Sequence, residues 1–247
     1  MNVLFIFFDK LRKKREFEDF MKDLMRKGAR VLVGTFLILS GLYVHQHYGI
    51  EYIRNITIVL AAFAIISDCL RLTFKIRLPY YEPFVMRDYE TVSLHGTTLA
   101  LVGCLLAYYV AGFDIAISAI AMYVYGDAAA GLVGMRLGKI KIIGKKSLEG
   151  SFLMFLTSLI VGLLMLKDFR LALFMAGFAT IIELFFLAPA DDLALPFFTA
   201  LGGQCIGGVF GIRPCMRGLL GGLFFVSVSM IIAIIFVRIY NWLRRRI

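Results

Sequence analysis

The sequence predicts an all-α fold, a polytopic transmembrane helical bundle, and three observations lead to this fold class. Of the 247 residues, 60% are hydrophobic and only 18% are charged, whereas charged residues make up roughly a quarter of a soluble domain. Apolar runs close to the length of about 20 residues that crosses a bilayer recur along the chain. The segments between these runs are alternately rich and poor in Lys and Arg, so most of the positive charges fall on one side of the membrane. We therefore expect the bilayer, not water, to solvate most of the chain.

Eight candidate spans account for the apolar runs, although seven or nine would also fit. With the N-terminus in the cytoplasm, most of the 27 Lys and Arg residues fall in cytoplasmic segments. This distribution predicts a multi-pass protein with both termini cytoplasmic, placed in the cell membrane if the source is prokaryotic. It also explains the net charge of +10 without a nucleic-acid partner. The spans lie near residues 31–48, 53–70, 92–112, 114–136, 148–166, 170–188, 194–212 and 218–240.

The residues before the first span form a separate predicted unit, residues 1–30, followed by a transmembrane catalytic domain over 31–247. Phe17, Phe20, Leu24 and Met25 recur at helical spacing among charged residues. This pattern fits an amphipathic helix on the cytoplasmic interface, and a solvated linker fits it equally well.

The fourth predicted span contains the most informative motif. Asp127, Ala130, Gly134 and Gly138 fall within about 80° on one helical face. Helix packing explains the small residues, but an acid in mid-helix costs about 2.5–3.5 kcal/mol on insertion scales. We interpret Asp127 as a functional residue with a cation as its partner.

A basic, glycine-containing loop follows and leads into the fifth predicted span. Its Lys145, Lys146, Ser147, Glu149 and Gly150 fit positive-inside topology, with Ser147 as a helix N-cap. Lysines and free backbone N–H groups at a helix N-terminus also suit phosphate groups. Both interpretations remain open from the residues alone.

A third polar cluster lies between Pro189 and Pro196, after Glu183 on the sixth predicted span. We place Pro196 at the first position of the next helix, which leaves Asp191 and Asp192 in the loop before it. Two adjacent acids in a loop without Lys or Arg indicate coordination of a hard divalent cation, Mg²⁺ bound through phosphate oxygens.

Further polar residues fall on the same predicted side. Asp68 and Arg71 lie three residues apart, so a simple ion pair between neighbouring helical turns would be enough to explain them. Arg87 precedes the third span. Acids for a metal, lysines for phosphates and a lipid-solvated body together predict phosphoryl transfer to or from a lipid.

These motifs resemble those of the CTP-dependent lipid kinases, a family typified by dolichol kinase, phytol kinase and the CTP-using diacylglycerol kinase. The resemblance is carried by D-x-x-A-x-x-x-G-x-x-x-G from Asp127 to Gly138, by K-K-S-x-E-G from Lys145 to Gly150, and by the acidic loop. It is strongest over 126–200, fainter over 66–110 and absent from the N-terminal helix. The chain departs from the family at Leu193, where many relatives have Asn or a similar polar residue.

The resemblance implies transfer of the CTP γ-phosphate to the hydroxyl of a dolichol, polyprenol, phytol, geranylgeraniol or diacylglycerol type of acceptor, with release of CDP and a requirement for Mg²⁺. Asp127, Asp191 and Asp192 would be catalytic, the first two as metal ligands. Residues implied in nucleotide binding are Gly134, Gly138, Lys145, Lys146, Ser147, Glu149 and Gly150; Asp68, Arg71, Arg87 and Glu183 are further candidates.

Two other classes of protein are the main alternatives, and a phosphatase that runs the reverse chemistry is a weaker third. A CDP-lipid synthase would use CTP in the membrane but release pyrophosphate, and the chain lacks the D-R-x-D-like signature typical of that class. A transporter would line a path with its acids, and it commonly shows repeated halves or broken helices at the midplane. No convincing repeat is visible in this sequence, and its acids gather on one side.

Overall fold

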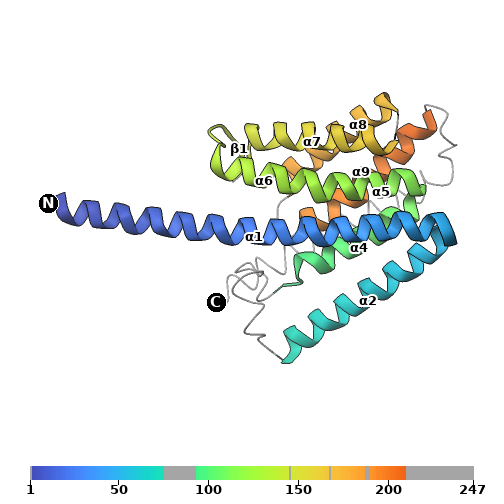
Figure 1. Cartoon of the computed structure of the whole chain (residues 1–247), viewed down its shortest axis with the longest axis horizontal. Helices are drawn as coiled ribbons and strands as arrows, with labels where there is room; N and C mark the ends of the chain where they lie inside the picture. Colours follow the sequence, from blue (N-terminus) through green and yellow to red (C-terminus); the bar gives the residue numbers. More distant parts are fainter. Residues whose placement is uncertain (1, 75–92, 145, 167, 187–189, 210–247) are drawn as a thin grey trace.

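The structure is a computed structural model that describes the backbone of residues 2–74, 93–144, 146–166, 168–186 and 190–209, with side chains from residue 23 onward in these ranges. Over this part of the chain it is a bundle of helices (Figure 1). Four helical segments are long and apolar enough to cross a membrane: Asp23–Tyr48, Ile50–Phe74, Phe113–Arg136 and Leu148–Leu166. The predicted helical bundle is therefore confirmed. The total of eight spans and the cytoplasmic termini stay predictions, and the eighth span and the C-terminus lie outside the described residues.

The first helix, α1 (Asn2–Tyr48), is continuous for 47 residues. It includes both the predicted interfacial segment and the first predicted span, and no helix end falls at residue 30. Its N-terminal half extends beyond the rest of the bundle (Figure 1). Gly49 then takes a left-handed φ of 84°, which lets the chain reverse tightly into α2 (Ile50–Phe74).

A buried helix forms the middle of the bundle. It consists of α5 (Phe113–Ala121), the π-helical turn η2 (Met122–Gly126) and α6 (Asp127–Arg136), and it follows α4 (Gly96–Val110). Its many small side chains, such as Ala116 and Ala119, are fully buried. Small residues let neighbouring helices approach closely, which supplies much of the packing between helices in lipid. The fourth predicted span is thus the one that the other helices surround.

A two-stranded hairpin interrupts the otherwise all-helical fold after α6. Strand β1 (Lys141–Ile143) pairs antiparallel with β2 (Lys146–Ser147), and Gly144 at the turn has a φ of 57°. The remaining described helices are α7 (Leu148–Leu166), α8 (Phe169–Phe185) and α9 (Ala190–Val209). The basic segment that we predicted as a loop is therefore partly a hairpin, which leads directly into α7.

The predicted start of α9 is wrong. We expected Pro196 at the first helical position, but α9 is helical from Ala190 and contains Pro196 in its interior. Asp191 and Asp192 consequently lie in the first turn, where acids interact favourably with the helix dipole. Pro196 cannot donate a backbone hydrogen bond to the carbonyl four residues earlier, that of Asp192. The helix tolerates this loss close to its end.

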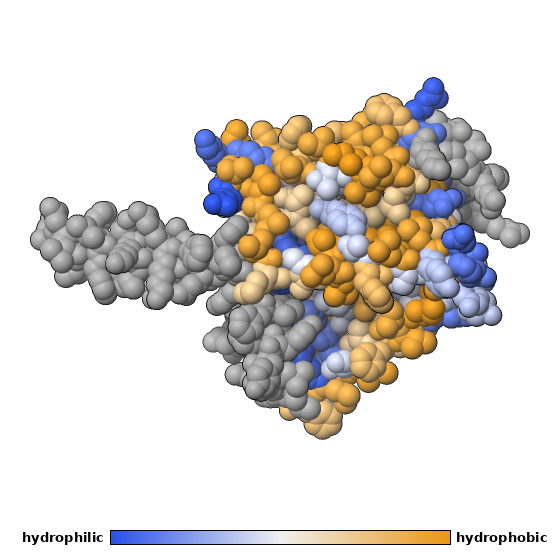
Figure 2. Space-filling model, viewed as in Figure 1, coloured by the Kyte–Doolittle hydropathy of each residue, from blue (hydrophilic) through white to orange (hydrophobic). Residues whose placement is uncertain are grey.

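Large apolar side chains cover the outside of the bundle. Leu32, Phe63, Leu164 and Phe185 are all more than 70% exposed. Figure 2 shows an apolar surface across the middle of this face, with hydrophilic residues gathered towards its two ends. Such a surface fits a hydrocarbon solvent, and several of the helices could span a membrane.

Helix α4 packs closely against the first turns of α9 at Gly103. A β-carbon added there would lie 2.6 Å from the Leu193 carbonyl oxygen and 2.9 Å from Pro196 Cγ. We expect Gly103→Ala to lower the free energy of unfolding by about 1–3 kcal/mol. The atom nearest to the new methyl group belongs to the backbone of α9, which cannot shift without disturbing that helix. Thermal unfolding of the purified protein in detergent measures this change.

The matched control is Gly177→Ala on α8, where an added β-carbon meets nothing within 4 Å. This substitution should be neutral or slightly stabilising, since Ala is more favourable than Gly inside a helix by about 1 kcal/mol. Equal stability of the two variants would contradict the close contact between α4 and α9.

Candidate functional site

Two of the predicted catalytic acids meet at one arginine. Arg30 Nη1 lies 2.7 Å from Asp127 Oδ2 and 3.0 Å from Asp192 Oδ1. The three residues come from α1, α6 and α9, so the contact joins segments that are distant in sequence. The Asp192 side chain is only 3% exposed and that of Asp127 is 15% exposed. A single guanidinium group therefore contacts both acids in a largely buried position.

Lys27 adds a second cation, one turn before Arg30 on α1. Its Nζ lies 3.2 Å from Asp127 Oδ2 and donates a hydrogen bond of 2.9 Å to the Asp127 carbonyl oxygen. The lysine side chain crosses Gly131, where an added β-carbon would lie 2.3 Å from Lys27 Cε. We call Lys27, Arg30, Asp127 and Asp192 the four-charge cluster. It contains two positive and two negative side chains.

Tyr123 completes the surroundings of Asp192. Its hydroxyl donates a hydrogen bond of 2.9 Å to Asp192 Oδ1, and the Arg30 guanidinium lies 5.5 Å from the centre of its ring. Tyr123 belongs to the π-helical turn that ends at Gly126, immediately before Asp127. Single π-turns inside α-helices are rare and frequent at functional sites. Here the turn presents Tyr123 and Asp127 to the same arginine.

The second carboxylate oxygen of Asp192 is buried, and no residue in the described part of the chain donates a hydrogen bond to it. Buried polar atoms normally have a partner, so such an atom calls for an explanation.

Asp191, the third predicted acid, accepts a hydrogen bond from the Asp192 backbone N–H at 3.0 Å through its Oδ1. The adjacent acids therefore differ in surroundings: Asp192 is buried against Arg30 and Tyr123, whereas Asp191 is partly exposed.

The glycines of the first motif pack against the start of α7. An added β-carbon on Gly134 would lie 3.1 Å from Ser147 Oγ, and one on Gly150 would lie 2.9 Å from the Ala130 carbonyl oxygen. Ser147 Oγ accepts the backbone N–H of Gly150 at 3.2 Å, which confirms Ser147 as the N-cap of α7. Gly138 also lies against Ser147. The two motifs are therefore in contact, about 10 Å along α6 from Asp127.

The hairpin is attached to its neighbours by two further charged residues. Glu149 accepts hydrogen bonds from the backbone N–H groups of Lys139 and Ile140 at 3.0 and 3.3 Å. Lys146 Nζ lies 2.9 Å from Glu183 Oε1 and donates to the Phe186 carbonyl oxygen at 2.9 Å. The structure thus pairs two predicted site residues, Lys146 and Glu183, apart from the four-charge cluster. Lys145 lies outside the described residues.

Asp68 and Arg71 connect α2 with the start of α4. Asp68 Oδ2 accepts the His95 backbone N–H at 2.8 Å and the Thr98 hydroxyl at 2.7 Å, while Arg71 lies 3.1 Å from Asp68 Oδ1. The expected i, i+3 ion pair is present, and the acid also supports the N-terminus of a helix. These contacts give the pair a structural role. Arg87 lies outside the described residues.

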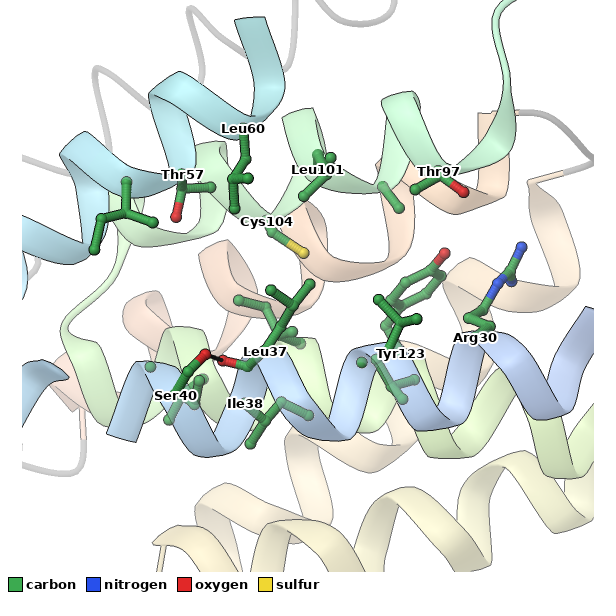
Figure 3. Close-up of a pocket in the computed structure, with 18 of the residues that line it drawn as sticks. Arg30, Leu37, Ile38, Ser40, Thr57, Leu60, Thr97, Leu101, Cys104 and Tyr123 are labelled. Atoms are coloured by element: carbon green, nitrogen blue, oxygen red, sulfur yellow. Dashed lines mark hydrogen bonds between the residues drawn. The ribbon is translucent and has the colours of Figure 1, made fainter. Parts of the chain in front are cut away.

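A cavity of about 510 Å³ lies between α1, α2, α4 and the α5–η2 segment. Figure 3 shows Leu37, Leu60, Leu101 and Cys104 along it, with Arg30 and Tyr123 together at one end. Ligand pockets typically have volumes of about 300–1,000 Å³ and are mainly apolar, with a few polar groups that orient the ligand. The polar end of this cavity is formed by residues that contact Asp127 and Asp192.

The acids near Arg30 fit a magnesium ion only if phosphate supplies further ligands. Among the described residues, no group of three His, Cys, Asp or Glu side chains is arranged to hold a metal. Mg²⁺, however, usually binds proteins through one or two carboxylates together with water and substrate phosphates. That smaller role for Asp127 and Asp191 stays a prediction.

Sequence reasoning missed Lys27, Arg30 and Tyr123. Both cations were assigned to membrane topology alone, although they lie three residues apart at the edge of an apolar span. Their spacing of three residues places both cations on one helical face, and this shared face is the sequence feature that could have indicated a common partner. Tyr123 lies four residues before Asp127, on the same side of that helix. Comparisons with protein-family models, characterised proteins and solved structures found no match.

The Tyr123 hydroxyl should contribute measurably to stability. Tyr123→Phe removes the donor to a buried carboxylate, and hydrogen bonds to charged groups contribute about 1.5–3 kcal/mol. We expect a loss of that size in the free energy of unfolding. The control is Tyr43→Phe on the same protein, since Tyr43 is 60% exposed on α1 and its substitution should change little. Similar unfolding temperatures for the two variants would argue against the contact between Tyr123 and Asp192.

Proposed function

We propose that the protein is a membrane phosphotransferase that moves the γ-phosphate of CTP to the hydroxyl of a lipid alcohol and releases CDP. One observation carries this proposal: an apolar cavity between helices ends at Arg30 and Tyr123, which contact the buried Asp192 and, through Arg30, the partly buried Asp127. A substrate that suits both parts has a hydrocarbon tail and a polar group at one end.

The cavity supports a lipid acceptor. Burial of apolar surface contributes about 25 cal/mol per Å², so an aliphatic chain placed against Leu37, Leu60 and Leu101 is held without polar contacts. The hydroxyl at the end of such a chain would then lie beside Tyr123. Dolichol, polyprenol, phytol, geranylgeraniol and diacylglycerol types of acceptor all have this form.

The acids have separate proposed roles. Asp127 and Asp191 would hold Mg²⁺, which neutralises charge on the phosphates when it is bound. Asp192 would accept the proton of the attacking hydroxyl through Oδ2, the oxygen to which no described residue donates. Tyr123 and Arg30 hold Oδ1 and so orient that carboxylate.

The choice of CTP rests on the resemblance of the motifs to those of the CTP-dependent lipid kinases. In this proposal Lys145 and Lys146, with Ser147, Glu149 and Gly150 and the glycines Gly134 and Gly138, surround the nucleotide. The packing of α6 on the start of α7 supports the grouping of the two motifs. We place this end of the bundle in the cytoplasm, because most of the Lys and Arg residues flank it.

The two main alternatives differ from the proposed kinase in what they do with CTP. A CDP-lipid synthase would release pyrophosphate from the same nucleotide, whereas a transporter would leave CTP intact. The test is purified protein in lipid nanodiscs with γ-labelled CTP, Mg²⁺ and a panel of lipid alcohols. We expect label on a lipid and CDP in solution; labelled pyrophosphate would indicate the synthase.

Asp127→Asn should abolish the transfer while the protein stays inserted and folded, although with a lower free energy of unfolding, because the amide keeps the shape of the side chain but lacks the charge that a metal ligand needs and that pairs with Arg30. Initial rates at saturating CTP, compared with size-exclusion profiles, measure both effects. Normal turnover by a well-folded Asn variant would remove Asp127 from the site.

Metal titration separates the roles of Asp191 and Asp192. The Asp191→Asn variant should need at least roughly tenfold more Mg²⁺ for half-maximal rate and recover in part at high metal, since a ligand is lost. The Asp192→Asn variant should bind CTP and metal normally but turn over roughly 10²–10⁴ times more slowly at every metal concentration. If both variants keep normal rates and metal dependence, the first turn of α9 is not part of the site.

A further inference from the structure

The charges within the four-charge cluster balance one another, with Asp191 as a further acid close enough to act on Arg30, and this pairing restricts what can enter the cluster. Lys27 and Arg30 supply two positive charges and Asp127 and Asp192 supply two negative ones. The Lys27 side chain is only 8% exposed and that of Arg30 is 20% exposed, so water screens these charges poorly. Buried charges are stable only when they are paired. Any ion that enters must therefore leave every one of the four side chains with a partner.

A divalent cation alone cannot meet that condition. Bound to Asp127, it would take that carboxylate from both cations, so that Lys27 loses its carboxylate and Arg30 keeps only Asp192 beside two added positive charges. A phosphate group alone would in turn meet the carboxylates of Asp127 and Asp192. When metal and phosphate enter together, Asp127 can bind the metal while Lys27 and Arg30 bind phosphate oxygens, and Asp192 keeps its contacts with Arg30 and Tyr123, so that all charges are paired.

We propose that Lys27 and Arg30 bind phosphate groups of the metal-bound donor, and that in the free protein they are internal counter-ions of the acids, so that metal and phosphate bind cooperatively. This inference rests on the metal and phosphate chemistry of the proposed function. It goes beyond that function because it assigns two cations of α1, a helix that the family resemblance does not cover. The planar guanidinium group of Arg30 suits the exchange, since its fork matches carboxylate and phosphate oxygens equally well.

The surroundings of the two cations support this exchange. Arg30 lines the apolar cavity, and in Figure 3 its side chain extends to the same end of the cavity as Tyr123. A phosphate group at this end would be close to a hydroxyl held by the cavity. Lys27 reaches the cluster across Gly131, where the missing side chain leaves room for its passage. Arg30 thus lies between the cavity proposed for the lipid and Asp127, an acid proposed for the metal.

Two binding measurements on the purified full chain in detergent test the inference without a lipid acceptor. Electron paramagnetic resonance measures the affinity for Mn²⁺ alone, and equilibrium dialysis measures the affinity for labelled CTP with and without Mg²⁺. In the unaltered protein we expect weak Mn²⁺ binding and CTP binding that tightens at least roughly tenfold with Mg²⁺. Arg30→Gln should tighten the binding of Mn²⁺ alone by roughly tenfold, because a competing cation is removed, and weaken CTP binding with Mg²⁺ by a similar factor.

Arg170→Gln is the matched control, since it removes the same charge from an exposed position at the first turn of α8; it should change neither affinity. Arg30→Lys keeps the charge and should keep weak binding of Mn²⁺ alone. Size-exclusion profiles check the fold of each variant. If Arg30→Gln does not fold, Lys27→Gln takes its place, with the same direction expected for both affinities.

Unchanged or weaker Mn²⁺ binding in the folded Gln variants would overturn the inference and leave Arg30 a purely structural link. The same holds if CTP binding to the unaltered protein is independent of Mg²⁺. Cooperative binding without any transfer to a lipid alcohol would instead refute the lipid kinase and leave the inference standing. Lipid phosphorylation with unaltered binding in the variants would refute the inference alone.

Discussion

An acid in the middle of an apolar bundle must be neutralised, and much of the structure around the site follows from that requirement. The Asp127 carboxylate is only 15% exposed and is neutralised by Arg30 at 2.7 Å and Lys27 at 3.2 Å. Loss of one partner from a buried ion pair costs about 3–5 kcal/mol. The two cations therefore hold α1 against α6, and Arg30 adds α9 through Asp192. This polar contact fixes the relative position of three helices whose apolar surfaces alone would allow many arrangements.

The local backbone around Asp127 serves the same requirement. The π-helical turn over Met122–Gly126 adds a residue to the helical turn and changes the direction in which the preceding side chains point. Tyr123 can then donate to Asp192 while Asp127, four residues later, reaches Arg30. Gly131 leaves space for the Lys27 side chain. Small residues on α6 thus have two uses: those nearest the hairpin pack against α7, and Gly131 admits a cation.

The features that the sequence predicts well are those set by neighbouring residues. Composition and apolar runs predict a helical bundle, and the spacing of Asp127, Gly134 and Gly138 predicts a face of small residues with one acid. Ser147 acts as the N-cap of α7, as its position indicates. In each case the physical cause, lipid solvation, helical periodicity or capping, acts over a few residues. The convergence of Asp127 with Asp192 also follows, since both were expected at the same end of the bundle.

The features that it does not predict depend on residues far apart. Arg30 and Asp127 are 97 positions apart, and nothing in their local sequence identifies them as partners. Lys27 and Arg30 resemble ordinary charges at the cytoplasmic edge of a span, and only the folded chain shows their pairing with acids. The start of α9 was misjudged for a related reason: Pro196 normally indicates a first helical position, but here it lies inside the helix and packs against Gly103 of α4, a residue far away in the sequence.

Helix α1 connects the apolar and the charged parts of the site. Val33, Gly34 and Leu37 on this helix line the cavity, and Lys27 and Arg30, one to two turns earlier, pair with the acids. A continuous helix is stiff over this distance, because each turn is held by its own backbone hydrogen bonds. A ligand that displaces α1 along the cavity must therefore also move the two cations relative to Asp127 and Asp192. Conversely, an ion that takes the acids from Arg30 loosens the contact that holds this wall of the cavity in place. The apolar wall and the two cations are thus parts of one helix, so a displacement of α1 would change both the cavity and the pairing of the acids.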